Sequence, residues 1–191
     1  MFAKMMLTAL LALTAENLLF SGGIGFSRAL RAARRPSSAG FFALFVTLFS
    51  LCSALVGNWL FPYFISSQWI LYPAVLTAAA GVTYFIAAGF LHAFAKKFYE
   101  THAQILAQAA ANTIVLAIPY VQQMFRFSLT ETVGYALGTG IAFFLAVLIL
   151  EQAMKTCSNP DMPQAFSGLP GVLVYVGILS MAFAGFSGKV F

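Results

Sequence analysis

Long apolar runs separated by short polar segments dominate this chain. A helix needs about 20 apolar residues to cross roughly 30 Å of hydrocarbon. Six runs reach this length, and the predicted spans are residues 5–26, 40–61, 69–94, 103–124, 132–154 and 170–188. The runs lack the alternation of barrel strands, so they predict helices. The pattern predicts an all-α integral membrane protein, in which residues 1–191 form one domain of six transmembrane helices.

The first and fourth apolar runs are the least regular, because each contains polar and helix-breaking residues. Glycine weakens a helix, and proline removes a backbone donor and clashes with the preceding turn. Polar side chains inside a span are costly and face protein or water. We therefore predict that these two helices are interrupted, that Gly23 marks a close backbone approach, and that the helix-breaking residues are Gly22, Gly23, Gly25 and Pro119.

The two irregular runs occupy corresponding places, since each is the first of a set of three. Three spans per half make the two halves opposite in orientation, which is typical of inverted-repeat membrane proteins with a working site near the midplane. Residues 16–19 (ENLL) can be set against residues 111–114 (ANTI). The pattern predicts a 3+3 inverted repeat, and the candidate midplane or ion-path residues are Glu16, Asn17, Asn112 and Thr113.

Glu16 is the carboxylate that lies well inside a predicted span, since Glu151 lies near the end of the fifth. A buried carboxylate pairs with a partner, binds a cation or carries a proton. The alternative is a structural role, in which Glu16 is neutral or is hydrogen-bonded to Asn112 or to backbone freed by the glycine break. The sequence leaves both interpretations open.

Composition agrees with a membrane protein, because 61% of the residues are hydrophobic and only 8% are charged, against about 25% charged residues in soluble domains. Nearly all of the chain is needed to cross the bilayer, which leaves no soluble nucleotide or flavin domain. We therefore expect at most a non-autonomous subunit of an oxidoreductase or translocase, and we assign no catalytic residue. We expect no nucleic-acid partner, because the net charge of +5 is explained by basic loops.

The basic residues predict an orientation. The loops after the first, third and fifth spans share one side and carry seven basic residues, whereas the other side carries Lys4, Arg126 and Lys189. The positive-inside rule then places both termini outside a bacterial-type inner membrane. The alternative is a cleaved signal peptide at residues 1–15, but cleavage leaves five spans and puts the arginine-rich loop outside. The seven residues are Arg28, Arg31, Arg34, Arg35, Lys96, Lys97 and Lys155.

Several segments carry a family resemblance. The C-terminal residues 161–188 (DMPQAFSGLPGVLVYVGILSMAFAGFSG), residues 134–148 of the fifth span, and the SLCS and NWL segments at residues 50–53 and 58–60 together resemble the six-helix membrane subunits of Rnf and Nqr ion-translocating redox complexes, above all the RnfA/NqrE branch. The resemblance implies electron transport coupled to movement of Na⁺ or H⁺. It also implies a homologous six-span partner subunit, other complex subunits and membrane lipid.

The resemblance also implies a [2Fe-2S] cluster, whose ligands are one cysteine in each interrupted helix of two paired subunits. This sequence departs from that pattern. Thr113 stands where the family carries cysteine, and residues 21–25 (SGGIG) stand where the first-span cysteine belongs. A threonine hydroxyl is a poor ligand for a soft iron site. Cys52 and Cys157 show no metal-binding spacing and are interpreted as unpaired thiols, so we expect no cofactor and no metal in this chain.

Three functions remain open at the level of the sequence. The first is a membrane subunit of an Rnf/Nqr-type complex. The second is a diverged paralogue that keeps the fold without electron transfer and acts as a scaffold. The third is an unrelated small inverted-repeat transporter built around Glu16.

Overall fold

The computed structural model describes residues 2–64, 69–159 and 162–186, which form helices joined by turns and contain no strand. Residues 187 and 188, which end the sixth predicted span, lie outside this range, and so does Lys189. In chain order the elements are α1 (Phe2–Leu13), α2 (Phe26–Ala33), η1 (Pro36–Ser38), α3 (Ala39–Phe64), η2 (Trp69–Leu71), α4 (Tyr72–Phe94), α5 (Lys96–Ala110), α6 (Thr113–Phe125), α7 (Leu129–Cys157), η3 (Gln164–Phe166) and α8 (Leu169–Phe186).

Among the described residues, four helical segments are long and apolar enough to cross a membrane. They are Ala39–Leu60, Tyr72–Phe94, the α5–α6 segment Lys96–Phe125, and Leu129–Cys157. The segments Phe2–Leu13 and Leu169–Gly185 are apolar but shorter. Each predicted span therefore contains apolar helix. The first differs most from expectation, because α1 ends at Leu13 and residues 14–25 form turns.

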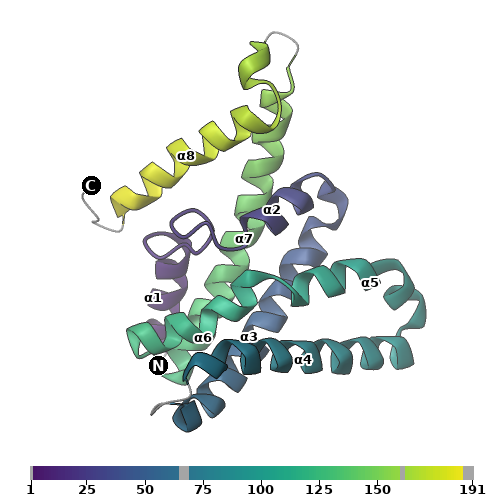
Figure 1. Cartoon of the computed structure of the whole chain (residues 1–191), viewed down its shortest axis with the longest axis vertical. Coiled ribbons are helices and arrows are strands. Elements are labelled where there is room, and N and C mark those ends of the chain that lie inside the picture. The colour runs from purple at the N-terminus through teal and green to yellow at the C-terminus, as the bar shows by residue number, and fades with distance from the viewer. Residues whose placement is uncertain (1, 65–68, 160–161, 187–191) are drawn as a thin grey trace.

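Helix α7 lies at the centre of the molecule and contacts α1, α2, α3 and α8 (Figure 1). It begins at a capping box, in which the backbone N–H of Ser128 donates to the Glu131 carboxylate at 2.9 Å. Helix α1 packs closely along α7, because a Cβ at Gly134 or Gly138 would clash with the α1 backbone at Met5 and Ala9. Close approach of this kind is how helices associate in lipid, where burial of apolar surface gives little driving force.

Helix α3 is the second central helix and contacts α4, α5, α6 and α7. Helices α4 and α5 lie side by side and run in opposite directions, while α8 leaves the end of α7 obliquely (Figure 1). Apolar side chains remain exposed on α4 and α8, among them Phe85, Phe90, Tyr175 and Ile178. Exposed apolar faces of this extent suit lipid or a partner subunit.

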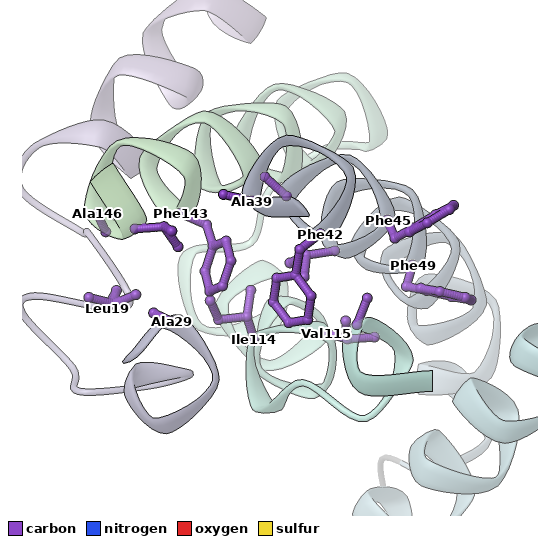
Figure 2. Close-up of a cluster of buried hydrophobic side chains, with 14 of the residues drawn as sticks. Leu19, Ala29, Ala39, Phe42, Phe45, Phe49, Ile114, Val115, Phe143 and Ala146 are labelled. Atoms are coloured by element: carbon purple, nitrogen blue, oxygen red, sulfur yellow. The ribbon is translucent and has the colours of Figure 1, made fainter. Parts of the chain in front are cut away.

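The core lies where the helix breaks meet α3 and α7. Figure 2 shows Leu19 and Ala29 on one side, Ile114 and Val115 on another, and Phe42 and Phe143 between them. The rings of Phe42 and Phe143 lie 5.5 Å apart. Residues more than 80 positions apart in sequence therefore form one apolar cluster.

Candidate functional site: the two helix breaks

The first break is organised by Asn17, whose side chain is buried. Its Oδ1 accepts hydrogen bonds from the backbone N–H groups of Leu19 at 3.0 Å and Phe20 at 3.1 Å. Its Nδ2 donates to the carbonyl of Leu13 at 3.3 Å. The asparagine thus satisfies the last carbonyl of α1 and two N–H groups of the turn that follows.

Two glycines return the chain from this turn to α2. Gly23 and Gly25 have φ values of +65° and +81°, which glycine adopts without the steric cost that a Cβ brings. The sequence-based prediction that Gly23 is a close-packing position is wrong, since nothing lies within 4 Å of a Cβ placed there. Gly22 is also part of the turn, and a Cβ there would lie 2.9 Å from the carbonyl oxygen of Leu18. The close approaches of this glycine run therefore belong to Gly22 and Gly25.

The second break lies at Ala111–Asn112, between α5 and α6. Asn112 has an extended backbone and caps α6, because its Oδ1 accepts from the N–H of Ile114 at 3.1 Å. The prediction that Pro119 breaks the fourth helix is therefore wrong, because Pro119 lies inside α6 and the helix continues through it. Its ring packs against Gly57 of α3, where a Cβ would come within 2.6 Å of the proline Cβ.

The two breaks touch one another. A Cβ at Gly25 would lie 2.9 Å from Asn112 Oδ1 and 2.7 Å from the Ile114 side chain. Asn112 is fully buried at this contact, whereas the Thr113 side chain is exposed. The structure thus brings together Asn17, Gly25 and Asn112 as the buried part of the site and leaves Thr113 on its surface.

Glu16 lies at the edge of the first break with a partly exposed side chain. The Tyr135 hydroxyl of α7 donates to the backbone carbonyl of Glu16 at 2.8 Å, which holds the turn against α7. Among the described residues the ion pairs are Lys4–Glu131 and Lys155–Glu151, and neither includes Glu16. Pairing of Glu16 with Asn112 is not found, because Asn112 Nδ2 has no hydrogen-bond partner within the described part of the chain.

A row of buried polar side chains continues from the second break along the α3–α6 contact, and sequence reasoning did not find it. Four buried atoms have no partner among the described residues: Ser50 Oγ, Ser53 Oγ, Asn112 Nδ2 and Gln122 Oε1. Gln122 Nε2 donates to Asn58 Oδ1 at 2.9 Å. Ser50, Ser53 and Gly57 lie on one face of α3 by helical spacing, and Gly57 of that face contacts Pro119.

Buried polar atoms in native proteins are nearly always satisfied, by protein or by ordered water. This row is therefore where we expect bound water. The available signal was the spacing of the two serines, Ser50 and Ser53, on one face of an otherwise apolar helix.

The two breaks contain no cysteine, the residue type that the family resemblance implies there. Cys52 lies on α3 in an apolar groove, and Cys157 is buried at the end of α7 beside Gly171. The breaks themselves supply amide and hydroxyl groups. These groups suit hard cations and water, whereas an iron–sulfur cluster needs thiolate ligands.

Known proteins resemble this chain over most of its length. One subunit of the proton-translocating ferredoxin:NAD(+) oxidoreductase complex from Clostridium ljungdahlii is 32% identical over 81 residues, which are 42% of each chain. One subunit of the ion-translocating oxidoreductase complex from Buchnera aphidicola is 33% identical over 79 residues, or 41% of each chain. These two matches span less than half the length of those relatives.

A longer match has lower identity. The corresponding subunit of the ion-translocating oxidoreductase complex of Aliivibrio fischeri is 24% identical over 172 residues, which cover 87% of this chain and 84% of that protein. The family model described as "Rnf-Nqr subunit, membrane protein" matches residues 5–190. The match runs through both helix breaks and every helix from α2 to α8, so this chain belongs to the Rnf-Nqr family of membrane subunits.

Proposed function

We propose that this protein is a membrane subunit of an ion-translocating redox complex, in which electron transport is coupled to movement of Na⁺ or H⁺. The observation that carries the proposal is the family match over residues 5–190. Family membership removes the unrelated transporter from consideration. The relatives from Clostridium, Buchnera and Aliivibrio are each one subunit of a larger complex, so the chain works with other subunits, among them a homologous six-span protein.

Helix packing supports a 3+3 inverted repeat. If α1–α4 are set against α5–α8 in order, three helix contacts of one half have counterparts in the other, whereas the α4–α5 contact has none. The α1–α7 contact corresponds to α5–α3, α2–α7 to α6–α3, and α3–α4 to α7–α8. The asparagine hydrogen bonds correspond too, because Asn17 and Asn112 each accept from the N–H two residues ahead. Six spans, an inner-membrane location and termini outside complete the proposed topology.

Ion movement is assigned to the breaks and to the polar row on α3 and α6. Discontinuous helices with midplane polar groups are the usual ion sites of inverted-repeat proteins. Glu16 supplies the carboxylate at the first break, and Asn112 joins the break to the polar row. Because these residues do not supply thiolates, we propose that this chain holds no iron–sulfur cluster and that electrons pass through other subunits.

The test replaces Glu16 in the whole complex. Inverted membrane vesicles containing the complex are energised with its electron donor, such as reduced ferredoxin with NAD⁺, and uptake of Na⁺ or H⁺ is followed. Glu16→Gln is expected to reduce uptake at least tenfold while the complex stays assembled. The matched control is Glu151→Gln, which removes a carboxylate paired with Lys155 at 2.6 Å at the end of α7 and is expected to leave uptake unchanged.

Two further results separate the parts of the proposal. Equal uptake in the Glu16 and Glu151 variants removes the carboxylate from the ion path. If deletion of the chain leaves electron transfer and ion uptake intact, the protein does not take part in coupled ion movement. That result favours the paralogue that acts as a scaffold, a role that needs no thiolate ligands. Stoichiometric iron in the purified chain contradicts the proposed absence of a cluster.

A further inference from the structure

Three arginines line one cavity at the end of the molecule that is predicted to be cytoplasmic. The cavity has a volume of about 500 Å³ and lies between α2, η1, the start of α3 and α5. Arg31, Arg34 and Arg35 form its basic wall, and Ser38, Thr101 and Gln104 add hydrogen-bonding groups. In the sequence these arginines only predict the orientation in the membrane, but in the fold they line one cavity.

The positive charge of this cavity is not neutralised by the part of the protein that the structure describes. Glu100 is the acidic residue of the lining, and the ion pairs found among the described residues, Lys4–Glu131 and Lys155–Glu151, do not involve the arginines. Three guanidinium groups facing one carboxylate leave an excess of two positive charges. Guanidinium groups bind phosphate with paired, charge-assisted hydrogen bonds, so the cavity favours a phosphate-bearing anion.

A separate apolar groove lies along the same helix, α3. Phe42 lines the arginine cavity, and Phe45, Phe49 and Cys52 line the groove. Positions 42, 45, 49 and 52 lie on the same side of α3 by helical spacing, so the groove begins one helical turn beyond Phe42 of the cavity. The groove has a volume of about 400 Å³, and its other walls are apolar residues of α4 and α5, including Ile86, Phe90 and Leu106.

We propose that this composite site binds an anionic phospholipid, with its phosphate among Arg31, Arg34 and Arg35 and an acyl chain in the groove between α3 and α4. A basic wall one helical turn from an apolar groove matches the two chemistries of one lipid molecule. A free phosphate or a nucleotide would contact the arginines and leave the apolar groove empty. Basic pockets between membrane helices on the cytoplasmic side recognise lipid head groups in this way.

The test uses the full chain, delipidated in detergent and titrated with dioleoyl phosphatidylglycerol or dioleoyl phosphatidylcholine, with bound lipid counted by native mass spectrometry. Phosphatidylglycerol is expected to bind at least tenfold more tightly than phosphatidylcholine. The triple variant R31Q/R34Q/R35Q is expected to weaken phosphatidylglycerol binding on the order of a hundredfold, since each basic residue contributes about a factor of five.

Two controls keep the test specific. The variant K96Q/K97Q/K155Q loses the same charge on the same side outside the arginine cavity and should bind phosphatidylglycerol nearly as well as the parent. Because loss of three arginines also alters the charges that direct insertion, Gln104→Glu places a carboxylate in the cavity while keeping every basic residue. It should weaken phosphatidylglycerol binding roughly fivefold, and the unchanged unfolding temperature of lipid-free protein checks folding.

Several outcomes would overturn the proposal. Equal losses in the arginine and lysine variants would mean diffuse attraction of anionic lipid to a basic surface. Displacement of phosphatidylglycerol by millimolar inorganic phosphate or ATP would mean that the cavity takes soluble anions. Unchanged binding in both the triple variant and Gln104→Glu would remove the cavity from lipid recognition.

Discussion

Asn17 and Asn112 make equivalent contacts at places where two helices stop. Each side-chain oxygen accepts from the backbone N–H two residues ahead, and each side chain is buried. Inside a bilayer, backbone groups that lose their helical partners must find others within the protein. Asparagine offers an acceptor on a short side chain, which explains why this residue type suits both breaks.

Gly25 and Gly23 allow a matched test of the contact between the breaks. Both have positive φ, so alanine at either position costs about 1–2 kcal/mol of backbone energy. Only Gly25→Ala also forces a Cβ into Asn112 and Ile114. Gly25→Ala should therefore destabilise the protein clearly more than Gly23→Ala, as measured by unfolding in mixed micelles. Equal destabilisation by the two substitutions would argue against the contact.

Helix α7 presents small residues to two neighbours. Gly134 and Gly138 face the α1 backbone, and Gly140 faces Thr47 of α3. Spacing of four residues puts the first two glycines on the same face, as in the small-residue motifs of membrane helices. Helix α1 is short, so its attachment to the molecule depends strongly on this contact.

Alanine at two helical glycines should have opposite effects. At Gly89 of α4 nothing lies within 4 Å of an added Cβ, and alanine favours a helix by up to about 1 kcal/mol over glycine, so Gly89→Ala should be neutral or stabilising. Gly138→Ala should destabilise, because its Cβ clashes with the backbone of Ala9. Unfolding in detergent measures both. A Gly138→Ala protein as stable as Gly89→Ala would contradict the α1–α7 packing.

The bundle joins the breaks into a larger polar system. The first break contacts the second through Gly25 and Asn112. From there the α3–α6 contact carries Ser50, Ser53 and the Gln122–Asn58 hydrogen bond. The polar groups come from segments far apart in the chain, and together they offer hydrogen-bonding positions in an otherwise apolar interior.

The double substitution Ser50→Ala with Ser53→Ala tests whether this row takes part in ion movement. Removing the two hydroxyls should lower the free energy of unfolding by no more than about 1 kcal/mol each, because that is the net contribution of a typical hydrogen bond. Ion uptake by the complex in vesicles should fall severalfold. Ser180→Ala on α8, away from the row, is the control and should leave uptake unchanged. Normal uptake in the double variant would make the row structural.

The local pattern of the sequence determined the helical membrane class, the positions of most apolar helices and the family. These features depend on hydropathy and on short motifs, which can be recognised from residues that are adjacent in the sequence. Tertiary structure decided the rest. The second break lies at Asn112 and not at the predicted Pro119, because Gly57 of α3 leaves room for the proline ring and α6 continues through it. Tertiary structure also brought Gly25 to Asn112 and gathered Arg31, Arg34 and Arg35 around one cavity. Such contacts join distant segments, and only the packing of the helices determines which of them meet.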